Sequence, residues 1–149
     1  MNTTEITITT RDFGDIVVNS NSIISFPNGI FAFENLKEFI LISPLGDGIY
    51  PMWLQNTEES KPCFIVYNPV EIIKDYNPEL SKENKSLLNY EEGDQLHYLV
   101  IAVVPSDFKN TTVNLKSPIV VNVTKSIASQ LTLDDDYQIK FPIFNKEDA

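Results

Sequence analysis

The sequence predicts one all-β domain: an antiparallel barrel or sandwich-like fold of about nine or ten short strands with one short helix. Three observations lead to this fold class. Apolar and polar residues alternate with a period of two along most of the chain. Turn signals built from Pro, Gly and Asn recur about every eight to twelve residues, a spacing typical of sandwiches and barrels. The length of 149 residues and the hydrophobic fraction of 42% suit a single core.

The first half of the chain contains six predicted strands, each followed by a turn signal. Ile6 and Ile8 alternate with polar residues, as in a half-buried strand, and Phe13-Gly14-Asp15 then predicts a tight reversal. Pro27-Asn28-Gly29 ends the third strand. The six segments are Glu5–Thr10, Ile16–Val18, Ser22–Phe26, Phe39–Ser43, Met52–Gln55 and Cys63–Tyr67.

The second half contains the longest predicted strand, Leu96–Val104, whose apolar run predicts that it is also the most buried. Three shorter β-branched or alternating segments follow it and complete the set. They are Thr111–Leu115, Ile119–Val123 and Leu131–Leu133.

Helical structure is predicted to be minor. Ser81 precedes Lys82–Leu88 and is placed to cap a short helix there, and Glu34–Phe39 is predicted to form one helical turn. Residues 71–94 carry seven acidic and three basic residues, which predicts an acidic excursion between strands. Residues 1–144 are therefore expected to form one β domain, and residues 145–149 a frayed tail.

The charge balance excludes several classes of partner. Eleven Lys and Arg residues against 21 Asp and Glu residues give a net charge of −10, and Arg11 is the single arginine. Direct nucleic-acid binding needs many cations to neutralise phosphates, and an anionic membrane surface repels an acidic protein. The single cysteine, Cys63, allows no internal disulfide. No signal peptide is evident at the N-terminus, so a cytoplasmic location is expected.

A search for chemistry finds no catalytic, cofactor or metal site. His97 lies in an apolar strand and is interpreted as a packed or rim residue, and Cys63 as a small buried hydrophobe. Asp134-Asp135-Asp136 is the best metal candidate, but it lacks the spacing of a calcium loop and is more typical of a solvated turn. Binding to proteins through strand edges or apolar patches is the favoured mode. Aromatic residues beside Pro in turns are candidate anchors, and the alternative is that these rings only plug the ends of the barrel or sandwich.

Eight segments, taken in order, resemble the FliW family of flagellar assembly factors. They are Thr10-Arg11-Asp12-Phe13-Gly14, Ile24-Ser25-Phe26-Pro27-Asn28-Gly29-Ile30, Phe33-Glu34-Asn35-Leu36-Lys37-Glu38-Phe39, Trp53-Leu54-Gln55, Phe64-Ile65-Val66-Tyr67-Asn68-Pro69, Thr112-Val113-Asn114-Leu115-Lys116-Ser117-Pro118-Ile119-Val120-Val121-Asn122, Gln130-Leu131-Thr132-Leu133-Asp134-Asp135, and Tyr137 with Phe141-Pro142-Ile143-Phe144. Together they span about residue 5 to residue 144, nearly the whole chain. The family's GIPGFE motif has Pro-Gly where this chain has Phe31-Ala32, which predicts a less sharply turned loop. Near the end, the family's Arg-His before Pro-Leu-Phe is replaced by Lys140-Phe141.

The resemblance implies a non-enzymatic protein that binds newly made flagellin as a chaperone. It also implies binding to the translational regulator CsrA, which relieves CsrA's repression of flagellin mRNA by partner switching. For flagellin we expect an apolar surface formed by turn residues, and for CsrA, a basic RNA binder, we expect carboxylates. The candidates are Ile30, Phe31, Phe33 and Phe144 for flagellin, and Glu71, Asp75, Asp134, Asp135 and Asp136 for CsrA. The alternatives are an all-β carbohydrate or small-ligand module, and an enzyme that uses scattered carboxylates.

Overall fold

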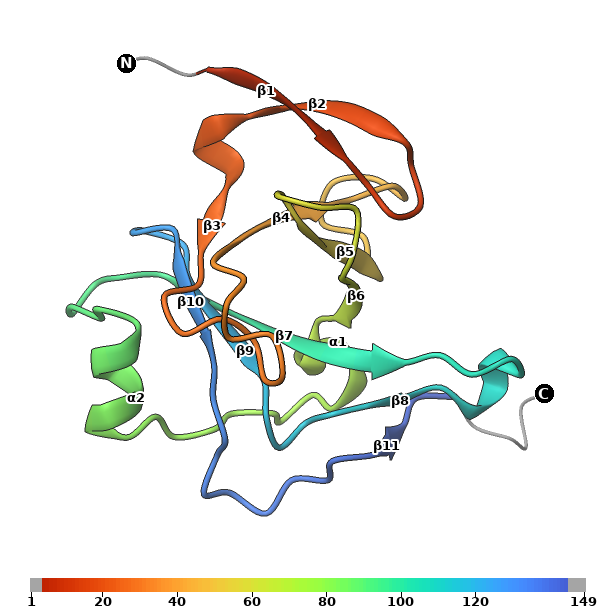
Figure 1. The fold of residues 1–149 in the computed structure, drawn as a ribbon. Coiled ribbons are helices and arrows are strands. Elements are labelled where there is room, and N and C mark those ends of the chain that lie inside the picture. Colours follow the sequence, from red (N-terminus) through yellow and green to blue (C-terminus); the bar gives the residue numbers. More distant parts are fainter. Residues whose placement is uncertain (1–3, 145–149) are drawn as a thin grey trace.

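The computed structural model describes residues 4–144 and contains a seven-stranded mixed β-barrel with additional strands (Figure 1). The barrel follows the order β7-β6-β5-β4-β3-β10-β9 and is closed by pairing between β7 and β9. The strands are β3 (Ile24–Ser25), β4 (Glu38–Ile42), β5 (Met52–Asn56), β6 (Cys63–Tyr67), β7 (Leu96–Val103), β9 (Ile119–Asn122) and β10 (Ile127–Gln130). Closure removes free edges from the ring. The predicted fold class is confirmed, with the refinement that β10 pairs with β3 in parallel.

Two elements lie outside the ring. The hairpin of β1 (Glu5–Thr9) and β2 (Asp15–Asn19) forms a separate two-stranded sheet, which arches over one side of the barrel (Figure 1). The predicted reversal joins these strands, with Gly14 at a φ of 66°. Strands β8 (Thr112–Val113) and β11 (Phe141–Pro142) extend the sheet beyond β7, so that the end of β7 projects from the barrel (Figure 1).

The core fills the inside of the ring with side chains from every barrel strand. Because side chains alternate across a strand, each strand contributes its inward-facing residues to this cluster. Phe26 and Phe39 are fully buried and meet edge to face, with ring centroids 5.0 Å apart. The buried members are Ile24, Phe26, Ile30, Phe39, Met52, Leu54, Val66, Leu99, Ile119, Val121 and Ala128.

The short helices carry the caps that their sequences predict. Helix α2 (Lys82–Leu87) begins after Ser81, whose hydroxyl accepts from the amide of Asn84 at 3.0 Å. A second helix, α1 (Pro69–Ile72), has the side chain of Asn68 as its N-cap and Pro at its first position, an arrangement the sequence prediction missed. No helix among residues 4–144 is long and apolar enough to cross a bilayer.

The acidic segment 71–94 is an excursion between strands, as predicted, but it also covers the outer face of the sheet. Tyr76 is buried, and its hydroxyl donates to the carbonyl of Leu115 at 2.9 Å. Leu88 is fully buried against Val120 and Leu131. The excursion therefore closes two further apolar clusters outside the barrel.

Three sequence predictions of local structure are wrong. Residues 131–133 are not a strand. Leu131 and Leu133 are buried, and their amides donate to the carbonyls of Pro118 and Lys116, but the strand in this region is β10, which ends at Gln130. Residues 34–39 form no helical turn, because the chain enters β4 at Glu38. Strand β7 is the longest, but β9 is the strand that is buried at every position. The predicted tail, residues 145–149, lies outside the described residues.

Candidate protein-interaction site

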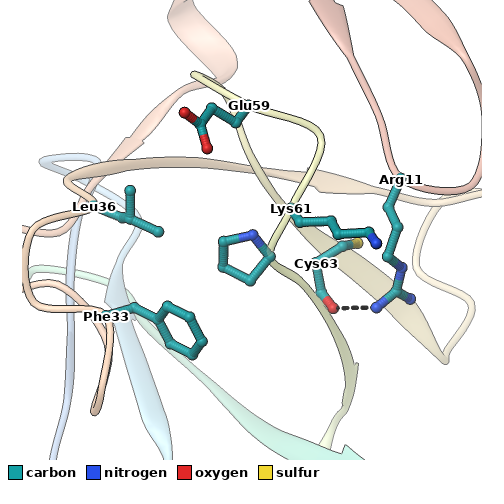
Figure 2. A pocket seen from close by; sticks show the side chains of 7 residues that line it. Arg11, Phe33, Leu36, Glu59, Lys61 and Cys63 are labelled. Atoms are coloured by element: carbon teal, nitrogen blue, oxygen red, sulfur yellow. Dashed lines mark hydrogen bonds between the residues drawn. The ribbon is translucent and has the colours of Figure 1, made fainter.

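A pocket of about 640 Å³ opens at one end of the barrel, beside the ends of β5 and β6 (Figure 2). Its floor is mostly apolar, and its rim carries charges of both signs. Phe33 and Leu36 come from the loop before β4, and Pro62 and Cys63 from the start of β6. The lining residues are Arg11, Phe33, Leu36, Glu59, Lys61, Pro62 and Cys63. A concave apolar surface with charged edges suits an apolar side chain of a partner.

The loop before β4 places its aromatic residues on both sides of the barrel end. Phe26 and Ile30 are buried and close the barrel, whereas Phe31 and Phe33 are 48% and 38% exposed. Phe33 rests edge-on against Phe64 of β6, with ring centroids 5.6 Å apart. The end-plugging role therefore holds for Phe26 and Ile30, while Phe33 presents apolar surface to the pocket and Phe31 is exposed two residues before it.

This loop is tightly turned, so the prediction of a less sharp turn is wrong. Ala32 has a φ of 73°, and the amide of Phe33 donates to the carbonyl of Ile30 at 2.6 Å. That left-handed conformation favours glycine. The turn forms with an alanine here, and a second bond, from the amide of Ala32 to Glu34 Oε2 at 2.9 Å, also holds it.

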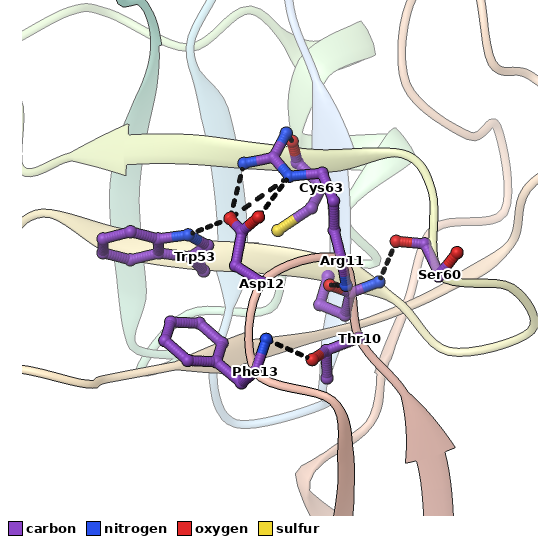
Figure 3. Close-up of polar contacts among 8 residues, drawn as sticks. Thr10, Arg11, Asp12, Phe13, Trp53, Ser60 and Cys63 are labelled. Atoms are coloured by element: carbon purple, nitrogen blue, oxygen red, sulfur yellow. Dashed lines mark hydrogen bonds and ion pairs between the residues drawn. The ribbon is translucent and has the colours of Figure 1, made fainter.

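A second feature of the pocket is the loop between β1 and β2, which is fastened to β5 and β6 (Figure 3). The amide of Arg11 donates to Gln55 Oε1 at 3.0 Å, and Arg11 Nη1 donates to the carbonyl of Cys63 at 2.7 Å. Asp12 accepts from the Arg11 guanidinium and from Trp53 Nε1, the latter at 2.8 Å. Phe13 completes the contact by meeting the Trp53 ring edge-on at 5.5 Å.

The electrostatics of this loop follow from the pairing. The hydrogen bond from Arg11 lowers the pKa of Asp12, and the same bond raises the pKa of Arg11. The single arginine is thus engaged within the protein. Lys61, by contrast, is exposed on the pocket rim, and the described part of the chain offers it no ion pair.

The predicted apolar residues do not form one surface. Ile30 is 1% exposed and belongs to the core, so its assignment to an exposed docking surface is corrected. Phe33 lines the pocket, whereas Phe31 is exposed two residues earlier on the same turn and is not one of the lining residues. Phe144 instead pairs with Phe108 on the projecting end of β7, with ring centroids 5.6 Å apart.

The five predicted carboxylates also separate into groups. Glu71, on α1, is close enough to Tyr50 to contribute to raising the pKa of Tyr50, after burial as the main cause. Asp134 and Asp135 line a second pocket, of about 450 Å³, together with Glu79. Asp75 and Asp136 are exposed; Asp75 lies four residues after Glu71, and Asp136 directly follows Asp135.

His97 and Cys63 occupy the environments that the sequence predicts. His97 lies at the rim of a small apolar cavity of about 170 Å³, and its Nε2 is 2.8 Å from the Tyr50 hydroxyl. Cys63 is 5% exposed, and burial raises its pKa to about 11, which disfavours the nucleophilic thiolate. Residues 4–144 contain no cluster of three or more His, Cys, Asp or Glu side chains arranged to hold a metal ion.

The sequence prediction missed the contacts of the loop at Arg11 and Asp12. The signal was present, because two of the eight segments of the resemblance, Thr10–Gly14 and Trp53–Gln55, supply most of these contacts. Trp53 donates its indole N–H to Asp12 and meets Phe13 edge to face, so both contacts hold it to the loop.

Comparisons with known proteins show which proteins have a similar sequence and a similar fold. A family model described as FliW protein matches residues 7–143. The chain is 37% identical over 138 residues to the flagellar assembly factor FliW of Caldicellulosiruptor saccharolyticus, with 92% of this chain and 90% of the relative covered. It is 35% identical to that of Geobacter sulfurreducens, with 93% and 87% covered. A crystal structure of a flagellar assembly factor FliW matches with a TM-score of 0.86 at 29% identity, covering 95% of this chain and 99% of the other.

Proposed function

Because the chain belongs to the FliW family of non-enzymatic flagellar assembly factors, we propose that it binds flagellin and the translational regulator CsrA in the cytoplasm. Bound flagellin is held as by a chaperone. Once flagellin has been exported, the free protein captures CsrA and relieves the repression of flagellin mRNA. Two partners that compete or couple on one protein produce such a switch by mass action.

The observation that carries the flagellin part is the apolar pocket lined by Phe33, with Phe31 exposed two residues earlier on the same turn. Exposed apolar surface with a polar rim often marks a site of protein–protein interaction. The unassembled ends of flagellin are amphipathic helices, whose apolar face fits a groove of this kind. Phe31 and Phe33 are the anchors in this proposal, and Ile30 supports them from within the core.

The flagellin site is tested by titration calorimetry with purified flagellin monomer. We expect the double variant Phe31→Ser, Phe33→Ser to lose about tenfold or more in affinity, as for anchor residues at other interfaces. The matched control is Val17→Ser with Leu45→Ser, since these side chains are 62% and 56% exposed elsewhere on the surface. Equal losses in both double variants, or no loss in the first, would contradict the assignment.

The CsrA part is supported by the charge of −10 and by the five exposed or half-exposed carboxylates. An acidic protein associates quickly with a basic RNA binder at low salt, and a bound negative surface repels RNA phosphates. Because the carboxylates lie in separate groups, they are neutralised separately. One variant carries Glu71→Gln with Asp75→Asn, and another carries all three changes of Asp134, Asp135 and Asp136 to Asn.

The readout is displacement of a labelled RNA from CsrA over a salt series. Neutralising the group that faces CsrA is expected to lower the displacement of RNA and to flatten the dependence of that displacement on salt. Asp47→Asn with Glu92→Gln serves as the control for the double variant, and the same pair with Glu5→Gln for the triple variant, because each removes the same number of charges from other exposed positions. If neither group differs from its control, the electrostatic mechanism is wrong, although CsrA binding by other contacts would still be measurable.

A further inference from the structure

The end of β7 that projects from the barrel forms a small three-stranded sheet with β8 and β11 (Figure 1). The register aligns Val103 with Thr112, and Thr112 with Pro142, so one row of side chains crosses all three strands. The neighbouring row aligns Ala102, Val113 and Phe141. Because successive residues of a strand point to opposite faces, these two rows lie on opposite faces of the sheet.

Only one of the two faces is covered. Val113 is buried, and Ala102 and Phe141 pack with it in the cluster closed by Tyr76. On the other face, Val103 is 65% exposed. One face of this sheet is therefore part of the core, and the other face has no partner among the described residues.

The uncovered face continues into an aromatic pair. Phe144 lies two residues beyond Pro142, and its ring meets that of Phe108 edge-on at 5.6 Å. Phe108 is 58% exposed, in the 3-10 turn η2 (Phe108–Asn110), which is held in place by Asp107 as its N-cap. We call Val103, Phe108, Pro142 and Phe144 the arm face. Thr112 lies between Val103 and Pro142 on this face, so the apolar residues surround one hydroxyl.

Two lysines lie next to the arm face in the sequence, although the net charge of the chain is −10. Lys109 follows Phe108, and Lys140 precedes Phe141, so alternation places Lys140 on the side of Pro142. Asp107 also lies next to Phe108, and its carboxylate accepts from the amide of Lys109 at 3.2 Å. An apolar strip bordered by lysines complements a segment that carries apolar residues on one side and acids on the other.

The dimensions of the arm face select the form of that segment. Three adjacent strands span roughly 10 Å from the first to the last, which matches the diameter of one α-helix. A second copy of this chain fits less well, because a two-fold contact through the arm face sets the lysines of one copy against those of the other. Two lysines on a protein of charge −10 are also too few to hold it on an anionic membrane.

We propose that the arm face is a docking surface for an acidic amphipathic helix, separate from the barrel-end pocket. Val103, Phe108 and Phe144 contact the apolar side of the helix, and Lys109 and Lys140 contact its acidic flank. The proposal goes beyond the flagellin and CsrA functions and does not depend on them, since it concerns different residues and is tested with a synthetic ligand.

The probe is a labelled helical peptide of about 20 residues, roughly 30 Å long, with Leu on one side and Glu on the other. Binding is followed by fluorescence anisotropy. We expect Val103→Ser with Phe108→Ser to weaken binding about tenfold or more. The control Val17→Ser with Leu45→Ser changes it less than about twofold. Since all four side chains are largely exposed, thermal unfolding is expected to stay close to that of the natural protein.

A charge exchange tests the polar part. Lys109→Glu with Lys140→Glu is expected to weaken the Glu peptide several-fold and to strengthen a Lys-bearing analogue. This gain must disappear when Phe108→Ser is added. Equal binding of the Glu peptide to the arm variant and the control would overturn the proposal. So would arm-dependent dimerisation in sedimentation, or arm-dependent binding to vesicles of phosphatidylglycerol, in the absence of peptide binding.

Discussion

Gly29 is the position at which the loop beside the pocket depends most on the absence of a side chain. Its φ is 65°, and a Cβ added there would lie 2.5 Å from Glu34 Cα and 2.5 Å from the carbonyl oxygen of Phe33. Contacts between carbon atoms are normally about 3.5–4.0 Å. The neighbouring atoms belong to the backbone, so Gly29→Ala cannot be accommodated by rotating a side chain.

The magnitude follows from three contributions. The left-handed conformation costs an alanine about 1–2 kcal/mol, and displacing packed neighbours costs about 1–3 kcal/mol. Restricting the unfolded chain returns about 0.4–1 kcal/mol. The free energy of unfolding is therefore expected to fall by about 2–4 kcal/mol, and the melting temperature by roughly 5–15 °C for a chain of this size.

Gly14→Ala is the matched control, because Gly14 has nearly the same φ, 66°, but no heavy atom within 4 Å of the added Cβ. It lacks the steric contribution and is expected to cost about 1 kcal/mol or less. Urea unfolding is followed by the fluorescence of the single tryptophan, Trp53, and both variants must keep the m-value of the natural protein. If the two free energies agree within about 0.5 kcal/mol, the close approach around Gly29 does not constrain the loop and the reasoning fails.

Three further predictions concern neighbouring positions. Ala32→Gly is expected to raise the free energy of unfolding by up to about 1 kcal/mol in urea titrations, since Ala32 has a φ of 73°. Cys63, with a pKa of about 11, is expected to react slowly with a thiol reagent at pH 8 and quickly in urea. Burial favours the neutral thiol of Cys63, so this group contributes stability that is fully present below about pH 9. The contribution is lost as the pH rises from about 9 to about 11. Asp12→Asn is expected to cost about 1 kcal/mol or less and to alter Trp53 fluorescence. The contribution of Asp12 is present above its ordinary pKa near 4 and is lost as the pH falls through the lowered value, which a pH series of unfolding curves checks.

Period-two alternation was enough to predict most strands, because inward and outward faces differ wherever a strand borders the core. It failed where buried and exposed residues alternate in a segment that does not pair with a neighbouring strand. Leu131 and Leu133 are buried and separated by the exposed Thr132, so they read as a strand, yet they only bond individually to the chain at Pro118 and Lys116. The true strand, Ile127–Gln130, is buried at three consecutive positions and shows no alternation.

The candidate site was harder to predict than the fold, because exposure is a property of the assembled barrel. Ile30 and Phe31 are adjacent apolar residues of one turn, but the first closes the barrel and the second is 48% exposed. Nothing local distinguishes them. The same holds for Phe144, whose partner Phe108 is 36 positions away and meets it only because β8 and β11 pair. The residue types indicated which kinds of contact a partner could make. Only the pairing of the strands showed on which surface each residue lies.

The separation of these surfaces limits how two partners can affect each other. Tyr50, which lies beside Glu71, precedes β5, and Lys61 of the pocket lies in the loop that follows β5. The strand between them, Met52–Asn56, is about 13 Å long at 3.3 Å per residue. That distance exceeds the screening length of about 8 Å at physiological salt. A closed and densely packed barrel also resists deformation. A partner bound at one end therefore opposes a partner at the other chiefly through its own bulk. With flagellin at the proposed pocket site and CsrA at the proposed Glu71 group, exclusion between them requires at least one to extend along the barrel wall.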